Sequence, residues 1–140
     1  MRPFEWSEEF DVHVSEIDVE HRELFRLADD LYGALIAEAP AGEVQAALAE
    51  LGTHVAEHFS HEEGLMRASG YLHYAWHRRQ HAAARARMAT LERRIRGGDR
   101  NAALLALDLS VALKNHIRLA DRMLGAYLRN QQRARAALAS

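Results

Sequence analysis

The sequence contains no cysteine, only two prolines and a single lysine, Lys114. Without cysteine there are no disulfides, thiolate metal sites or cysteine nucleophiles. Because Pro3 and Pro40 are the only prolines, long stretches of the chain are free to be helical. No apolar run approaches the roughly 18 residues of a membrane-spanning helix, and the N-terminus lacks the basic-then-apolar pattern of a signal peptide. We therefore expect a cytoplasmic protein.

The chain also lacks a strong charge of either sign. Its 18 basic and 20 acidic residues leave a formal net charge of -2. Such a balance gives no electrostatic footprint for nucleic acid or for an anionic membrane, so we expect neither as a partner. At 140 residues the chain fits one domain, residues 1–140, and we expect it to be a monomer. What the sequence has in excess is histidine, with nine residues.

Apolar residues recur every three or four positions along most of the chain, which predicts amphipathic helices. Turn-forming residues at 40–42, 69–70 and 97–99 separate these patterns. The predicted helices span about residues 18–38, 43–68, 72–96 and 101–128. Four long helices with short connections indicate an all-α fold, an antiparallel up-down-up-down four-helix bundle.

Both ends of the chain lie outside these helices. Residues 1–17 are rich in aromatic side chains, and we expect them to form an extended arm packed on the bundle. A side-chain N-cap at Ser15 or Asp18 would close this arm. The tail, residues 129–140, either frays or extends the fourth helix.

Histidines and carboxylates interrupt the predicted apolar face of every helix. On the second helix His58 and Glu62 lie four residues apart on that face, and His77 and His81 do the same on the third. Each helix therefore directs nitrogen or oxygen donors toward one axis. The full set is His21, His58, Glu62, His77, His81, His116 and Asp121.

Burying such groups costs several kcal/mol each unless something compensates for the lost water. A single histidine on an apolar face is more often a hydrogen-bonded core residue than a ligand. Seven such residues, however, are difficult to satisfy by mutual hydrogen bonds alone, and a bound cation is the simpler compensation. Imidazole suits zinc, copper, iron and nickel, while the carboxylates add a preference for iron or manganese.

The number of donors indicates two ions rather than one. Two six-coordinate ions offer twelve coordination positions. Five imidazoles fill five of them, two bridging carboxylates fill four, and a shared oxide or hydroxide fills two, which leaves one vacant. A centre with one vacant coordination position is suited to binding a small molecule.

The donor pattern differs from that of the ferritin-like di-iron enzymes, because no histidine has a glutamate three residues before it. The H-E-x-x-H signature of zinc proteases is also absent. The sequence instead resembles the bacterial hemerythrins, from the aromatic arm through the fourth helix. The matching motifs are F-E-W at 4–6, I-D-V-E-H-R-E-L-F at 17–25, H-F-S-H-E-E-G-L-M at 58–66, G-Y and H-R-R-Q-H within 70–81, and H-I-R-L-A-D at 116–121.

The resemblance implies that three histidines hold one iron ion and two histidines hold a second ion, which keeps the vacant position. Two carboxylates would bridge the ions together with an oxide or hydroxide. The first group is His77, His81 and His116, the second is His21 and His58, and the bridges are Glu62 and Asp121.

The implied function is reversible binding of dioxygen at the open iron, for storage, delivery or sensing. Leu113 and Ile117, which flank His116, would line the oxygen pocket. The main alternative is a di-iron enzyme that uses the same open site, as an oxidase, a peroxidase or a nitric-oxide-consuming protein. A bundle with purely structural metal is a third. We favour oxygen binding because no residue suited to acid–base chemistry stands beside the inferred open position.

Some positions depart from the pattern of the family. Ala84 and Ala112 stand where aromatic residues are usual, so we expect a pocket that is more open, or refilled by Trp76 or Met88. His13 stands where relatives often carry glycine.

Three further histidines, His54, His61 and His73, lie off the predicted inner faces or near a helix start. We interpret them as surface or flanking residues rather than as ligands.

Overall fold

A computed structural model describes residues 3–139, and most of them are helical. The elements in chain order are η1 (Glu8–Phe10), α1 (Ser15–Ile36), α2 (Ala41–Ser69), α3 (Tyr74–Arg96), α4 (Ala102–His116), η2 (Ile117–Asp121) and α5 (Arg122–Ala139). Within residues 3–139, no helix combines the length and the apolar character that crossing a membrane requires.

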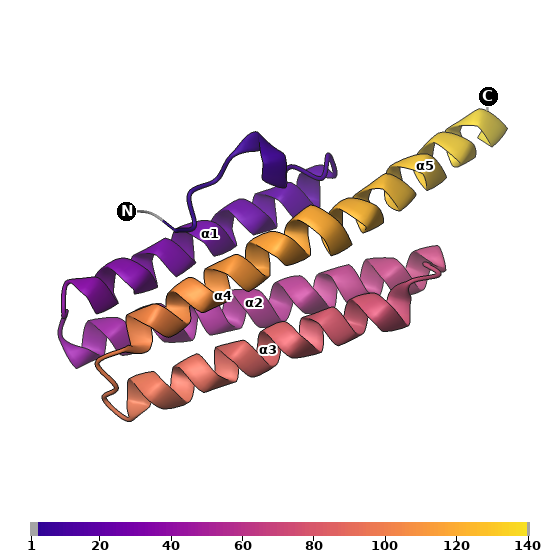
Figure 1. Cartoon of the computed structure of the whole chain (residues 1–140). Helices are drawn as coiled ribbons and strands as arrows, with labels where there is room; N and C mark the ends of the chain where they lie inside the picture. The colour runs from indigo at the N-terminus through magenta and orange to yellow at the C-terminus, as the bar shows by residue number, and fades with distance from the viewer. Residues whose placement is uncertain (1–2, 140) are drawn as a thin grey trace.

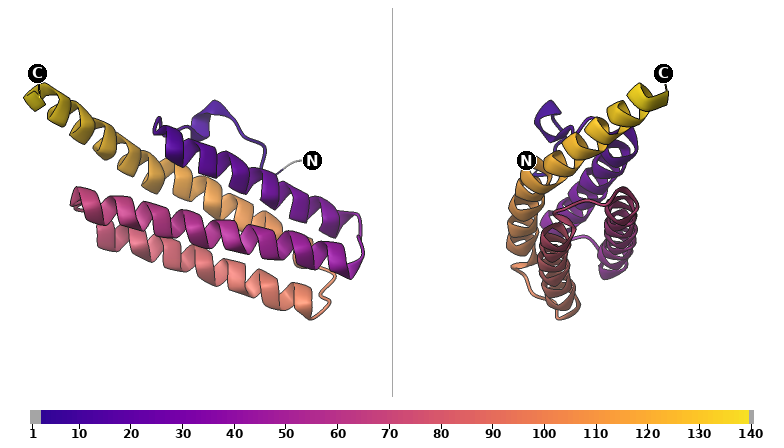
Figure 2. Two further views of the ribbon diagram at one scale, coloured as in Figure 1. Left: turned by 180° about the vertical axis from the view of Figure 1, so that it is seen from behind. Right: turned by 90° about the vertical axis from the view of Figure 1, so that its right-hand side faces the viewer.

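The helices pack side by side as a four-helix bundle, in which α4, η2 and α5 together form the fourth rod (Figure 1, Figure 2). Short connections reverse the chain between successive rods, which confirms the predicted all-α, up-down-up-down arrangement. The helix bounds differ slightly from the predicted ones. α1 begins at Ser15 rather than at about residue 18, and α3 begins at Tyr74 rather than at about residue 72.

One cluster of buried hydrophobic side chains runs through the bundle, with members from the N-terminal segment and from each of the four rods. The stripes predicted from the sequence face this core: Leu51 and Val55 of α2 and Met88 and Leu91 of α3 are all buried. The energy of folding therefore comes mainly from the apolar faces of the helices.

The fourth rod is not the single α-helix that the sequence pattern predicts. Ile117–Asp121 forms a π-helical segment, whose wider turn places residue i+5 near residue i. In a regular α-helix His116 and Asp121 would point roughly 140° apart. The π turn therefore allows both side chains to face the interior of the bundle.

The predicted tail extends this rod, since α5 continues to Ala139 and its end projects past the other helices (Figure 1). Its base is attached to the end of α2. The Tyr127 hydroxyl and the Gln131 amide both donate to the Ser69 carbonyl, at 2.6 and 2.9 Å. α2 itself ends at Gly70, whose φ of 66° places it in the left-handed conformation typical of a helix C-terminus.

The aromatic N-terminal segment packs against α1, as the sequence predicts. The rings of Phe4, Trp6 and Phe10 surround Phe25 of α1, with centroid separations of 6.0, 5.4 and 5.1 Å. The segment is not extended throughout, because Glu8–Phe10 forms a turn of 3-10 helix.

The predicted side-chain N-cap at Ser15 or Asp18 is wrong. The N-cap residue of α1 is Val14, and no side chain caps this end. The Asp18 carboxylate instead accepts a hydrogen bond from the Val12 N–H at 2.9 Å, which holds the N-terminal segment to the helix. His13 has a φ of 61°, a left-handed conformation that glycine adopts without strain.

We predict that Gly125→Ala destabilises the fold, because a Cβ at this position would lie 2.6 Å from the Val12 carbonyl oxygen and displace the N-terminal segment. The expected loss in the free energy of unfolding is about 1–3 kcal/mol, measured by chemical denaturation. Gly33→Ala is the matched control: it is a helical glycine with open space around it, and it should gain about 0.5–1 kcal/mol. Equal stability of the two variants would contradict the close packing.

Candidate metal centre

Seven polar side chains meet inside the bundle, and they are the seven that the sequence singles out. Their donor atoms form two overlapping groups, and in each group one donor atom per residue lies within 4.8 Å of the others. The larger group is Glu62, His77, His81, His116 and Asp121, and the smaller is His21, His58, Glu62 and Asp121. All four rods of the bundle contribute, so the group assembles only when the bundle is complete.

These side chains are almost completely removed from solvent. Glu62, His77 and His81 have no exposed surface, and the His116 side chain, with 7% exposed, is the most accessible of the seven. Ionisable groups at this depth are found paired, hydrogen-bonded or bound to metal, because isolated charges cost too much to bury.

The Glu62 carboxylate faces both groups at once. Its Oε1 lies 2.9 Å from His81 Nε2 and 3.4 Å from His77 Nε2. Its Oε2 lies 3.3 Å from His58 Nε2 and 3.6 Å from His21 Nε2. One oxygen is therefore directed to each group.

Asp121 repeats this arrangement from the fourth rod. Its Oδ1 lies 2.9 Å from His77 Nε2 and 3.0 Å from His116 Nε2, and its Oδ2 lies 3.0 Å from His21 Nε2. Each of the two carboxylates therefore lies between the larger group, with three imidazoles, and the smaller group, with two. This is the geometry expected of ligands that bridge two cations.

Several of these short separations are not hydrogen bonds. Within the described residues, neither oxygen of Asp121 has a hydrogen-bond partner, and neither do the Nε2 atoms of His21, His58, His77 and His116. Their lone pairs converge on shared points instead of pairing a donor with an acceptor. Buried polar atoms are rarely left in this state, so the cluster fits a site that cations complete.

The electrostatics of the cluster lead to the same conclusion. Burial alone would lower the pKa of His58, but the Glu62 and Glu20 carboxylates outweigh it and raise that pKa to about 10. Burial is similarly outweighed at His77, where Asp121 and Glu62 raise the pKa to about 9. The cluster therefore attracts positive charge, as protons or as metal ions, and metal binding would displace the protons.

Two carboxylates outside the cluster hold His58 and His81 from behind, and neither carboxylate was predicted from the sequence. Glu20 Oε1 accepts from His58 Nδ1 at 2.7 Å, and Glu63 Oε2 accepts from His81 Nδ1 at 2.8 Å. A proton on Nδ1 leaves the Nε2 lone pair free to face the centre. Each of the two stands next to a predicted ligand in the sequence, but it lies off the apolar stripe and looks like an ordinary surface acid.

His61, interpreted from the sequence as a flanking residue, is half-buried and shares the Glu20 carboxylate, with its Nδ1 2.9 Å from both oxygens. On the other side of the centre, Arg85 donates to Glu63 at 3.0 Å. The carboxylates of Glu20 and Glu63 are thus each held by a further side chain on the side away from the centre.

Phe59 forms one wall of the centre. Its ring stacks on the His81 imidazole, with centroids 4.0 Å apart and planes within 9° of parallel. The Arg85 guanidinium lies over the same Phe59 ring at 5.3 Å. His81 is therefore positioned by an aromatic face as well as by its hydrogen bond.

A cleft of about 280 Å³ lies where the sequence lacks two aromatic side chains. Ala84 of α3 and Ala112 of α4 both line it, and it reaches His116. Trp76 forms part of its wall without filling it, and Met88 is buried in the core. The cleft is open beside His116, but Leu113 and Ile117 do not line it, so the effect of the two alanines on the oxygen pocket stays a prediction.

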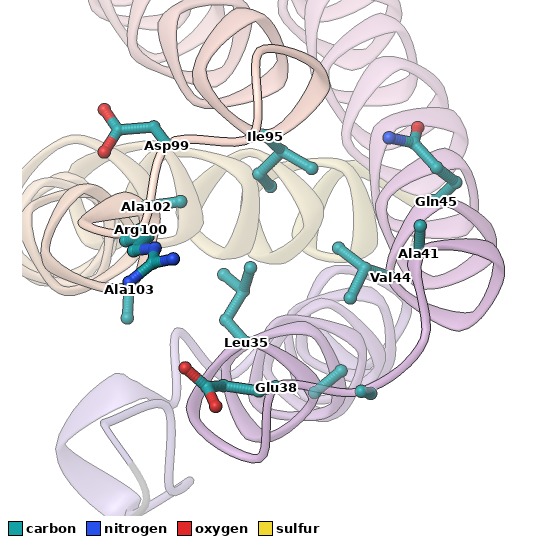
Figure 3. A pocket seen from close by; sticks show the side chains of 13 residues that line it. Leu35, Glu38, Ala41, Val44, Gln45, Ile95, Asp99, Arg100, Ala102 and Ala103 are labelled. Atoms are coloured by element: carbon teal, nitrogen blue, oxygen red, sulfur yellow. The ribbon is translucent and has the colours of Figure 1, made fainter.

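A second hollow, of about 290 Å³, lies at the other end of the bundle, between the α1–α2 and α3–α4 connections (Figure 3). Its lining includes Leu35, Val44 and Ile95 but no histidine. The metal donors and this hollow are therefore separate features of the fold.

The sequence matches the family model described as the hemerythrin HHE cation binding domain over residues 12–128. The chain belongs to the hemerythrin family. It is 31% identical over 115 residues to a bacteriohemerythrin of Stenotrophomonas maltophilia, a match that covers 81% of this chain and 73% of the relative. It is 32% identical over 81 residues to a bacteriohemerythrin of Clostridium acetobutylicum, covering 56% of this chain and 63% of the relative.

We predict that Glu20→Ala weakens binding of a metal ion at the smaller donor group by about 10–100-fold, because His58 loses the acceptor that orients it. Anaerobic titration with Fe²⁺ measures the effect. Glu23→Ala is the matched control, since this partly exposed carboxylate on the same helix bonds only Arg26 among the described residues. If both variants bind Fe²⁺ as tightly as the unmodified chain, Glu20 does not position the ligand.

Proposed function

We propose that this chain is a single hemerythrin-like domain that holds two iron ions and binds dioxygen reversibly, for storage, delivery or sensing. The observation that supports this most directly is the placement of Glu62 and Asp121, each with one oxygen toward each histidine group. Two carboxylates shared between two sets of imidazoles suit a pair of ions linked by a small oxide or hydroxide.

The unequal division of the histidines supports one open coordination position. The larger group offers three imidazoles, His77, His81 and His116, while the smaller offers only His21 and His58. With both carboxylates shared, the ion in the smaller group has one ligand fewer. The iron pair, when bound, supplies the electrons that a reversible bond to dioxygen requires.

The chain's own residues would hold the ions and keep water away. Imidazole and carboxylate together form a donor set that iron accepts well. Leu113 and Ile117 are buried on the same rod as His116, and we assign them to the wall of the oxygen pocket. Apolar walls of this kind limit proton access and thereby favour release of dioxygen over its reduction.

A di-iron enzyme is the second candidate, and one observation favours it. The cleft lined by Ala84 and Ala112 reaches His116 from the surface and gives a small molecule an approach to the larger donor group. An oxidase, a peroxidase or a nitric-oxide-consuming protein would use such an approach. We place it second because, apart from the proposed ligands, the lining has no group suited to general acid–base catalysis.

Metal analysis combined with visible spectroscopy tests the proposal. We expect two irons per chain and a charge-transfer band that appears with oxygen and fades under vacuum. Glu62→Ala should lose at least one iron together with the band, because each ion loses a shared ligand. Glu57→Ala, an exposed acid on the same helix, should retain both.

Three results would count against this function. One zinc per chain would exclude a di-iron centre. Both irons retained in Glu62→Ala would show that this carboxylate is not a bridge. Rapid, irreversible loss of the ferrous form with turnover of a substrate would favour the enzyme.

We predict that Ala112→Trp lengthens the lifetime of the oxygenated form by several-fold, because an indole at this position fills the cleft beside His116 and excludes water. Decay of the oxygen-dependent band measures the lifetime. Val111→Trp is the control: this neighbouring side chain is 59% exposed and does not line the cleft. An unchanged or shorter lifetime in Ala112→Trp means that the cleft does not limit stability of the oxygenated form.

A further inference from the structure

The cleft between α3 and α4 has features that the proposed oxygen chemistry does not use. Its floor consists of small side chains, among them Ala84 and Ala120, which are buried. Trp76 and Leu119 supply its large apolar side chains, and His116 lies at its inner end. A volume of about 280 Å³ is near the lower limit of ligand-binding pockets and fits a molecule with one ring.

Hydrogen-bonding groups line this cleft without a protein partner. Within residues 3–139, the Trp76 indole N–H and the amides of Gln80 and Asn115 make no hydrogen bond to another residue. Amide groups both donate and accept, so they suit a hydroxyl group. A ligand with a hydroxyl on an apolar ring would pair them while covering the alanine floor.

The charges around the cleft are already matched. Arg87 also lines it, but its guanidinium is paired with the Asp108 carboxylate. His116 directs its Nε2 to Asp121 in the metal centre, 3.0 Å away. Among the described residues of the lining, Arg87 is the one with a permanent charge, and because it is paired the lining favours an uncharged ligand.

A second groove of similar volume, between α1 and α2, shows the contrast. It is lined by Glu20, Glu23 and Glu57 together with His54 and His58, and it has no aromatic side chain. Its acidic lining disfavours an apolar ring, so the features that suit one are specific to the cleft at Trp76.

We propose that the α3–α4 cleft is a binding site for a small, uncharged aromatic alcohol of the phenol class. The ring packs against Trp76 and the alanine floor, and the hydroxyl bonds the Gln80 or Asn115 amide. A bound molecule lies against His116 and closes the approach to the centre from this side. This site does not depend on oxygen binding, so failure of the proposed function leaves it intact.

Isothermal titration of the isolated protein with phenol tests the proposal, with benzoate as the charged analogue of similar size. We expect phenol to bind with a Kd of about 1 mM or lower, well inside the upper bound on affinity for a ligand of its size, and benzoate to bind at least about tenfold more weakly. Trp76→Ala should weaken phenol binding by up to about tenfold through loss of ring packing.

Two filling variants and one matched control complete the experiment. Ala112→Trp and Ala84→Phe occupy the cleft and should each abolish phenol binding, whereas Val111→Trp, outside the cleft, should leave it unchanged. Circular dichroism identifies the variants that keep the helical fold, and two positions keep the test valid if one variant unfolds. The proposal is overturned if no binding is detected at a phenol concentration tenfold above the expected Kd. It is also overturned if both filling variants, once shown to be folded, still bind phenol, or if benzoate binds as tightly as phenol.

Discussion

Two carboxylates buried among five imidazoles form the constraint on which the rest of this structure depends. Glu62 and Asp121 are essentially without solvent contact, and burial alone would keep a carboxyl group protonated. The surrounding histidines hold the pKa of both well below the usual range. Negative charge at this depth is stable only beside positive charge, so the cluster is a place that suits bound cations.

The bundle meets this constraint by supplying donors from every rod. A single helix offers two donors on one face at spacing i, i+4, as His58 with Glu62 and His77 with His81 do. The fourth rod brings His116 and Asp121 together at a spacing of five by means of its π turn. Irregular helical geometry at a functional site is common, and here it aligns the Asp121 carboxylate with the other donors.

Contacts outside the cluster give the donors their orientation. Glu20 and Glu63 accept hydrogen bonds from Nδ1 of His58 and His81, and His61 and Arg85 in turn hold these carboxylates from outside. The small side chains of Ala84 and Ala112 leave a cleft on one side of the centre. Access to the centre from the α3 and α4 side is therefore a property of this chain's own residues.

Apolar periodicity, and donors on the same stripe, are properties of local spacing, so the sequence alone predicts the helical class, the order of the helices and the inward placement of six donors. The seventh, Asp121, lies five residues after His116 and faces the other donors only because of the π turn. The sequence could not determine the π turn, since Ile117–Asp121 reads as ordinary helix and only the requirement that Asp121 face the other rods selects the wider turn. It could not distinguish Glu20 and Glu63 from solvated acids, because their partners lie 38 and 18 residues away. The π turn and the partners of these two carboxylates are set by the tertiary structure, because only the folded chain brings distant side chains within hydrogen-bonding distance.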